Sequence, residues 1–163
     1  MKRFAILALS AATLLATACS KDKENTPQPK TTEQLLSANV WHMTALTANP
    51  GLQTGTGTTV TDIYPFVPGC TQDDTHQFVA GGQFKSDEGV SKCDPSDAQT
   101  VTGTWSFVKT GNDNGVNILL NGNQLRFKVL EVSATQLKMV TNDDVFGVGT
   151  GTSVAYTLTY TKQ

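Results

Sequence analysis

Short runs that alternate apolar and polar residues, separated by tight turn signals, constrain the fold of this 163-residue chain more than any other feature. In residues 101–108 (VTGTWSFV), valine, glycine, tryptophan and phenylalanine alternate with threonine and serine, which is the period of a strand with one buried face. In residues 41–47 (WHMTALT), Trp41, Met43 and Ala45 are expected on the buried face. Similar patterns predict further strands at residues 59–66, 75–79, 83–86, 116–120, 124–130, 136–141 and 153–161.

Turn residues join these strands in the order of the sequence. Residues 121–123 (NGN) and 80–82 (AGG) predict β-hairpins, because asparagine and glycine adopt positive φ at low cost. Residues 111–115 (GNDNG) predict another turn, and residues 49–51 (NPG) are expected to end the first strand.

Helix signals are confined to the residues ahead of the first strand. Thr31 and Gln34 have the spacing of a capping box, and Leu35 and Leu36 follow. We therefore predict an all-β domain, an antiparallel up-and-down β-barrel of about eight strands with a short N-terminal helical turn. A barrel of this size is just wide enough for side chains or one small ligand. An open sandwich is the alternative.

The N-terminus has the anatomy of a secretory signal. Lys2 and Arg3 precede an apolar run that is too short to cross a bilayer of roughly 30 Å, and small residues lead up to Cys19. This arrangement resembles the lipobox of bacterial lipoproteins, in which the cysteine thiol carries diacylglycerol. We therefore expect Cys19 to be lipidated; the alternative is an ordinary signal peptide with an accidental cysteine.

The chain is accordingly divided into a lipoprotein signal peptide (residues 1–18), a tether (19–30) and a β-barrel domain (31–163). The tether carries charges and two prolines, and fully extended it would reach about 40 Å. We expect a monomer anchored by its lipid to the outer membrane of a cell envelope, with the periplasmic or the surface-exposed leaflet left open.

The two remaining cysteines, Cys70 and Cys93, are expected to form a disulfide, because an exported chain matures in an oxidising compartment. Such a bridge would lower the conformational entropy of the unfolded chain and thereby stabilise the fold by roughly 3 kcal/mol. A catalytic thiol or a metal pair is the alternative, but neither cysteine belongs to a CxxC motif and the chain has only two histidines.

Several of these motifs together resemble a known family. Leu35-Leu36 ahead of Trp41, "CTQDDTHQFVAGGQF" from Cys70, "KCDPSD" around Cys93 and "GTWSF" from Gly103 are similar to the lipocalin-like domains of Bacteroidota lipoproteins. The resemblance implies a calycin-type barrel and a bridge between Cys70 and Cys93. It carries no assigned activity.

The polar motifs indicate turns more than chemistry. Residues 73–76 (DDTH) predict a turn in which aspartate caps backbone N–H groups at the entry to the strand at Thr75. The alternative is a cluster that binds a cation or acts as a general base, which adjacent strand residues disfavour because they point to opposite faces. The segments 112–115 and 142–144 lack the terminal glutamate of an EF-hand loop, and the Gly/Thr runs lack the lysine of a phosphate loop. His42 is expected to be exposed. We expect no catalytic residues, no metal and no cofactor.

The aromatic residues suggest a pocket. The expected lining of an apolar pocket consists of Trp41, Met43, Phe78, Phe84, Trp105, Phe107, Phe127 and Tyr156. The same side chains would alternatively fill a small barrel completely. With a net charge of −2, the chain offers no basic patch for nucleic acid. We expect a non-enzymatic lipocalin-like lipoprotein that binds a small hydrophobic ligand; the alternative is a tethered module with a packed barrel that contacts an envelope protein or a glycan.

Overall fold

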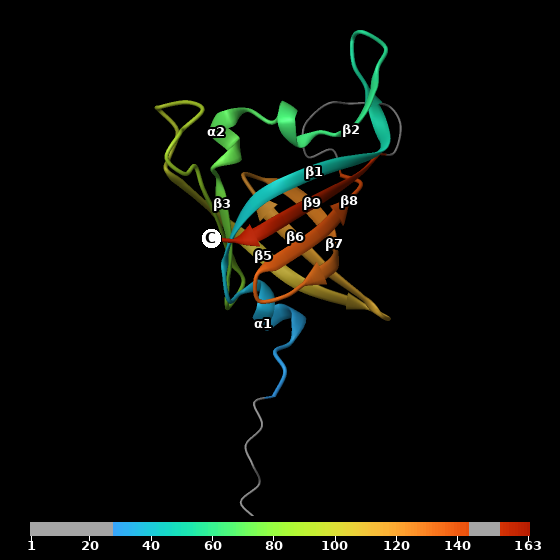
Figure 1. Cartoon of the computed structure of the whole chain (residues 1–163). Coiled ribbons are helices and arrows are strands. Elements are labelled where there is room, and N and C mark those ends of the chain that lie inside the picture. The colour runs from blue at the N-terminus through green and yellow to red at the C-terminus, as the bar shows by residue number, and fades with distance from the viewer. Residues whose placement is uncertain (1–27, 144–153) are drawn as a thin grey trace, which may run out of the picture.

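The structure is a computed structural model that describes residues 28–143 and 154–163. Within these residues nine strands form one antiparallel sheet in the order β2-β1-β3-β4-β5-β6-β7-β8-β9, and β1 also pairs with β9 (Figure 1). The strands are β1 (Val40–Gln53), β2 (Thr59–Asp62), β3 (Thr75–Val79), β4 (Gln83–Asp87), β5 (Thr100–Thr110), β6 (Asp113–Leu120), β7 (Asn123–Val132), β8 (Gln136–Thr141) and β9 (Ala155–Lys162). Eight of them close an up-and-down barrel and β2 lies outside it, which confirms the predicted fold class.

Strand β1 closes the barrel because it pairs with different strands along its length. Near its start, Trp41 lies opposite His76 of β3 on one side and opposite Lys162 of β9 on the other. Near its end, Leu52 pairs with Val60 of β2. The first strand and the last strand of the barrel are thereby neighbours.

The prediction that residues 49–51 end the first strand is wrong, because β1 continues to Gln53. Pro50 lies where the register of β1 with β2 shifts, between the pairs Thr47↔Asp62 and Leu52↔Val60. A proline lacks a backbone N–H, so a strand tolerates it at such an irregularity.

The inward face of β1 also changes along the strand. Trp41 and Met43 are buried as predicted, but a register shift against β9 follows between Met43 and Ala45. After the shift, Leu46 and Ala48 are the buried residues. The prediction that Ala45 continues the buried face is therefore wrong, because one extra residue at a bulge reverses the alternation.

Both hairpin predictions are confirmed. Gly81 and Gly82 have φ of +92° and +94° between β3 and β4, and Asn121 and Gly122 have φ of +51° and +79° between β6 and β7. Positive φ at both central residues matches the twist of the flanking strands.

Helix α1 (Thr32–Leu36) closes the lower end of the barrel (Figure 1). Its capping box is present, because Gln34 N donates to Thr31 Oγ1 at 3.2 Å and Thr31 N donates to Gln34 Oε1 at 2.9 Å. Leu36 is fully buried, and its carbonyl oxygen accepts a hydrogen bond from Trp41 Nε1 at 2.9 Å.

The opposite end carries two short helical segments, η1 (Tyr64–Phe66) and α2 (Gly69–Gln72). The predicted strand 59–66 is wrong in its second half, because β2 ends at Asp62 and Pro65 favours the first turn of η1. Helix α2 is not predicted by the sequence pattern. In the part of the chain that the structure describes, no helix has both the length and the apolar character needed to cross a bilayer.

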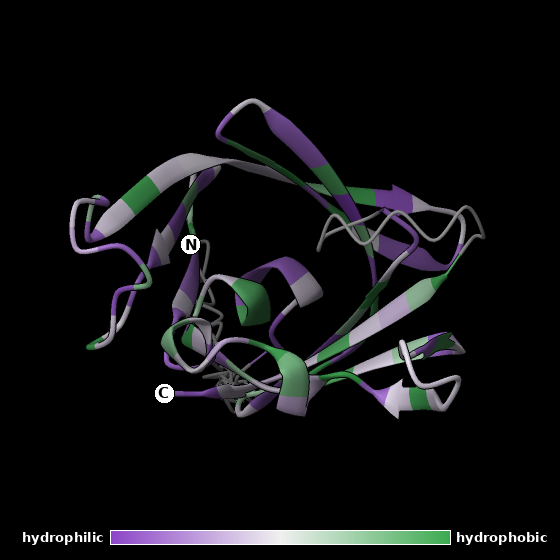
Figure 2. Cartoon of the chain, turned by 90° about the horizontal axis from the view of Figure 1, so that it is seen from above, coloured by the Kyte–Doolittle hydropathy of each residue, from purple (hydrophilic) through white to green (hydrophobic). Residues whose placement is uncertain are grey.

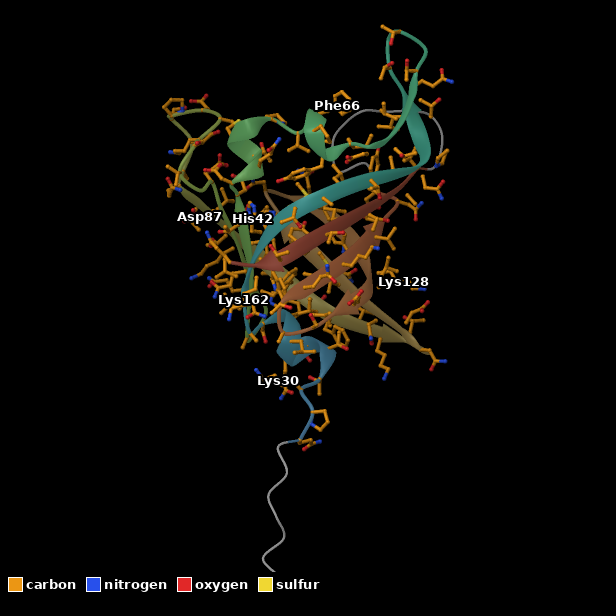
Figure 3. The ribbon with its side chains drawn as sticks, in the orientation of Figure 1. Lys30, His42, Phe66, Asp87, Lys128 and Lys162 are labelled. Carbon is orange, nitrogen blue, oxygen red and sulfur yellow. A yellow bond between two sulfur atoms is a disulfide. The ribbon has the colours of Figure 1, made fainter. Side chains whose placement is uncertain are left out.

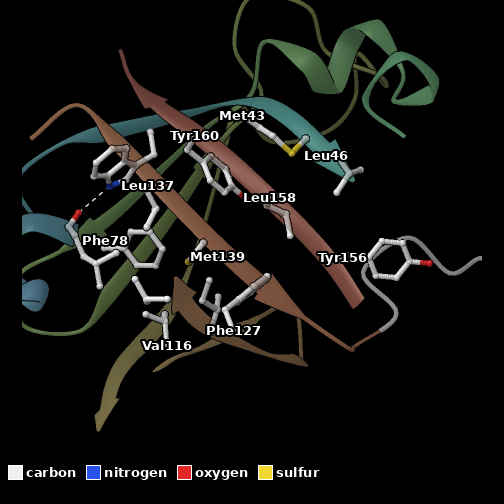
Figure 4. Close-up of a cluster of buried hydrophobic side chains, with 14 of the residues drawn as sticks. Met43, Leu46, Phe78, Val116, Phe127, Leu137, Met139, Tyr156, Leu158 and Tyr160 are labelled. Carbon is white, nitrogen blue, oxygen red and sulfur yellow. Dashed lines mark hydrogen bonds between the residues drawn. The ribbon is translucent and has the colours of Figure 1, made fainter. Parts of the chain in front are cut away.

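The inward side chains form one hydrophobic core. Hydrophilic and hydrophobic residues alternate along the strands in the view down the barrel (Figure 2). The largest fully buried side chains are Trp41, Phe78, Leu36, Leu46, Leu137, Met139 and Val116. Several of them come together in the interior in Figure 4.

Close backbone approach at Gly103 gives a test of this architecture. A Cβ atom on Gly103 would overlap the carbonyl oxygen of Leu119 on the adjacent β6, whereas a Cβ atom on Gly115 would have its nearest neighbours at an ordinary 3.4 Å. We expect Gly103→Ala to lower the free energy of unfolding by about 1–3 kcal/mol through overpacking. Urea unfolding followed by tryptophan fluorescence measures this change.

The matched control is Gly115→Ala, which we expect to change the free energy of unfolding by less than about 0.5 kcal/mol. Equal effects of the two substitutions would contradict the close approach of β5 and β6 at Gly103.

Candidate functional site

A cavity of about 170 Å³ lies inside the barrel, toward the end that carries α2. Its apolar wall is formed by Met43, Phe78, Phe84, Ile118, Leu120, Leu125, Phe127, Met139, Leu158 and Tyr160. Its polar lining is formed by Thr71, Asp74 and His76, which come from α2, the residues after it and β3. A dry protein cavity of roughly 150 Å³ binds benzene, so this one has room for about one ring or a short chain.

A second hollow of about 350 Å³ lies outside the barrel, between the β1–β2 hairpin and η1. Its lining includes Leu52, Val60 and Phe66, and Phe66 is 64% exposed. It is larger than the barrel cavity, but it is a surface groove without a charged side chain in its lining. The barrel cavity is the better candidate, because it lies among the inward side chains of the barrel and a few polar groups converge at one end of it, as at small-molecule sites.

Only some of the residues that the sequence predicts to line a pocket lie in the cavity wall. Met43, Phe78, Phe84 and Phe127 line the cavity. The wall does not include Trp41, Trp105, Phe107 or Tyr156.

These other residues fill the remaining interior. Trp41 packs against α1 through its hydrogen bond to Leu36. Trp105 Nε1 donates to the Val79 carbonyl at 2.8 Å, and its ring lies edge-on to Phe78 at a centroid distance of 5.3 Å. Tyr156 is buried toward the opposite end of β9 from Tyr160 (Figure 4). Trp41 therefore packs the α1 end of the barrel, Tyr156 fills the interior beside Ala48 at the other end of β9, and the cavity lies toward α2.

Asp73 caps backbone N–H groups, but they belong to the loop between β4 and β5, so the prediction that the cap lies at the entry to the strand at Thr75 is wrong. Its Oδ2 atom accepts hydrogen bonds from Val90 N at 2.8 Å and Ser91 N at 2.9 Å, in the loop between β4 and β5. These hydrogen bonds hold the pKa of Asp73 below its usual value, and Ser91 contributes most.

Asp74 and His76 have a different role, because both line the cavity. They are two residues apart, and alternate residues of an extended chain share a face. The spacing Asp-x-His directly before an apolar strand is the sequence signal that identifies this pair. Adjacent residues point to opposite faces, so only the spacing of two residues reveals that Asp74 and His76 lie on one face.

The carboxyl group of Asp74 is poorly compensated. Its Oδ1 atom is buried and has no hydrogen-bond partner among the described residues. Burial, together with the smaller effects of the nearby charges of Glu88, Asp73 and Asp87, raises the pKa of Asp74 to about 6. Such perturbation is typical of functional groups in clefts.

His76 is held in its neutral form. Its ring stacks on Phe84 at 5.7 Å and meets the Tyr160 ring edge-on at 5.8 Å. Burial lowers the pKa of His76 to about 4, and the charge of the half-exposed His42 adds a smaller effect. Nδ1 of His76 lies 3.2 Å from Ser86 Oγ, so one ring nitrogen is already hydrogen-bonded.

Two connections fasten the β4–β5 loop to the cavity end. The disulfide Cys70–Cys93 joins α2 to this loop with a Cα separation of 5.1 Å, which confirms the predicted bridge. The hydrogen bonds from Val90 and Ser91 to Asp73 provide the second connection. The residues that border the cavity opening are therefore fixed in place.

The motifs that resemble calcium loops have protein partners. Asp113 Oδ1 forms an ion pair with Lys128 Nζ at 2.9 Å, and Asp143 Oδ2 accepts a hydrogen bond from Arg126 N at 2.7 Å. The predicted loop residue Asp144 and the glycine run at 147–151 lie outside the described residues. Within the described ranges, no three His, Cys, Asp or Glu side chains converge to hold a metal ion.

No protein-family model matches the chain, and a search of curated proteins finds no significant match. The closed eight-stranded barrel is compatible with a calycin-like fold.

Asp74 and His76 should change stability with pH in opposite directions. Folded Asp74 keeps its proton up to about pH 6 but releases it near 3.8 when unfolded, so its contribution to stability falls as pH rises through this interval. Folded His76 stays neutral down to about pH 4 but titrates near 6.5 when unfolded, so its contribution falls as pH falls. We expect the two slopes largely to offset each other in the wild-type chain.

Single substitutions separate these slopes in urea unfolding measured between pH 4 and pH 6.5. In Asp74→Asn only His76 still contributes, so the free energy of unfolding should fall as pH falls. In His76→Gln only Asp74 still contributes, so the free energy of unfolding should rise as pH falls. Each change should be about 1 kcal/mol, reduced by solvent screening because both side chains are partly exposed. Parallel pH profiles of the wild type and both variants would contradict these assignments.

Proposed function

We propose that this chain is a lipid-anchored, non-enzymatic, lipocalin-like protein that binds a small apolar molecule inside its barrel. The observation that carries the proposal is the 170 Å³ cavity, lined by apolar side chains of the strands and bordered by a few polar groups at one end. Apolar walls supply affinity, and a few polar groups supply orientation.

The anchor is supported by the N-terminal sequence, which lies outside the described residues. A basic start, a short apolar run and small residues all end at Cys19. Lys30 lies at the α1 end of the barrel, whereas Phe66 lies at the opposite end (Figure 3). A tether at Cys19 would therefore leave the cavity end pointing away from the membrane.

Outer-membrane location and a monomeric state complete the proposal. Pairing of β1 with β9 gives every barrel strand two neighbours. A closed barrel has little unpaired edge through which to recruit a second copy.

A second candidate function is docking of an envelope protein or a glycan. Phe66 and Val90 are 64% and 96% exposed, and both lie on segments at the cavity end. This reading needs no ligand in the barrel, so a binding measurement distinguishes the two functions.

Toluene is a suitable probe of the cavity, because it is only slightly larger than benzene. At about ten times its Kd it should add about 1.4 kcal/mol of stability and raise Tm by about 5 °C. Ile118→Phe should abolish this increase, because Ile118 lines the cavity and a larger side chain would occupy the space. Differential scanning calorimetry measures the shift.

The matched control is Leu119→Phe, which adds the same ring to the adjacent residue on the outside of the barrel, where Leu119 is 48% exposed. This variant should keep the response to toluene. If toluene and other small apolar probes leave the Tm of the wild-type chain unchanged, ligand binding is refuted and docking is favoured.

Lipidation is tested separately in a Gram-negative bacterial host. The wild-type chain should incorporate radiolabelled palmitate and sediment with membranes, whereas Cys19→Ala should do neither, because the acceptor thiol is lost. Ser20→Ala is the control and should behave as the wild type. Palmitate incorporation that survives Cys19→Ala would contradict the anchor.

A further inference from the structure

The end of the cavity that carries Asp74 is chemically unlike the rest of its wall. Ten of the lining side chains are apolar or aromatic, and the polar side chains Thr71, Asp74 and His76 gather at the α2 end. A molecule that fills the cavity therefore has an apolar part among the strands and meets polar groups at one end.

Asp74 offers an unused hydrogen-bond acceptor at this end. Its Oδ1 atom, like Oδ1 of the neighbouring Asp73, is buried and has no partner in the described part of the chain, but only Asp74 lines the cavity. A buried carboxylate oxygen without a donor is costly, so it favours a ligand that brings a donor.

Electrostatics around Asp74 favour a positive charge. Its acidic neighbours Glu88, Asp73 and Asp87 all raise its pKa. The ion pairs of the described residues involve other carboxylates, Asp113 and Asp143. A cation at this position would relieve the repulsion among the four acidic groups.

We propose that the natural ligand is a small amphiphilic amine, whose apolar ring or short chain fills the barrel cavity and whose ammonium group binds the carboxylate of Asp74. This inference rests on the proposed function, since it names the ligand class of the same cavity. An ammonium group supplies both the hydrogen-bond donor that Oδ1 lacks and the charge that the acidic neighbours favour.

The other polar groups fit this assignment. His76 is neutral near pH 7, so it adds no charge that would repel a cation, and Phe84 and Tyr160 fix its ring. The aromatic rings of Phe84, Phe127 and Tyr160 line the same cavity and provide faces for a cation or for a ligand ring.

A carboxylate ligand is disfavoured by the same features. It would place a further negative charge beside Asp74 and its acidic neighbours, without a lysine or arginine in the lining. The cavity volume of about 170 Å³ also excludes complete burial of a long acyl chain.

Three probes that share one ring test the proposal: 2-phenylethylamine, 2-phenylethanol and 3-phenylpropanoate. Isothermal titration of the purified full chain at about pH 7.5 and low salt should give an affinity for the amine about tenfold above that for the alcohol, with the carboxylate weakest. The amine is protonated at this pH, as a lysine side chain is.

Asp74→Asn should weaken binding of the amine by about tenfold and leave binding of the alcohol unchanged, because only the charge is removed. Asp113→Asn is the control, since it removes the same charge from an exposed residue outside the cavity lining, and it should preserve the amine preference.

The outcomes separate this inference from the proposed function. If the three probes bind equally, or if the amine preference survives Asp74→Asn, the amine assignment is overturned while apolar binding stands. If none of the probes binds, both are overturned.

Discussion

Closure of the sheet through β1 is the constraint on which the rest of the structure depends. This strand pairs with β3 and β9 within its first ten residues and with β2 from Thr47 to its end. Because a barrel of eight strands has a fixed and narrow interior, its inward side chains must either fill that space or leave a defined cavity. Without the contact between β1 and β9, the same strands would form an open sheet with two exposed edges.

The interior divides into two parts with different physical roles. Around α1, large side chains and the indole hydrogen bonds of Trp41 and Trp105 leave a packed and fully satisfied core. Toward α2, the wall remains apolar but contains an acidic group with an unpaired oxygen. A stability argument explains the first part. It does not explain the second, because burial of an uncompensated carboxyl group destabilises a fold and is retained at sites that have another use.

Local sequence rules predict this fold well, because a meander depends on local signals. Alternation predicts most strands, and the turns at 80–82 and 121–122 follow from the backbone freedom of glycine and asparagine. The failures have non-local causes. The bulge after Met43 and the passage of β1 through Pro50 depend on which strands pair with β1, and α2 is a short segment tied down by a distant cysteine. That Asp74 and His76 share a face follows from strand geometry. That they line the same cavity as Leu120 and Leu125 depends on barrel closure.

The placement of the two ends has a consequence for ligand exchange. Helix α1 and the buried Leu36 and Trp41 block one end, so molecules enter and leave the interior at the other. In the proposed lipid-anchored arrangement the chain enters at the blocked end, so that route would start in water instead of in the hydrocarbon of a bilayer. A ligand of the proposed kind would have to dissolve as a monomer to use this route, which would favour short and polar-headed molecules and would make the barrel unsuited to extracting long-chain lipids from a membrane.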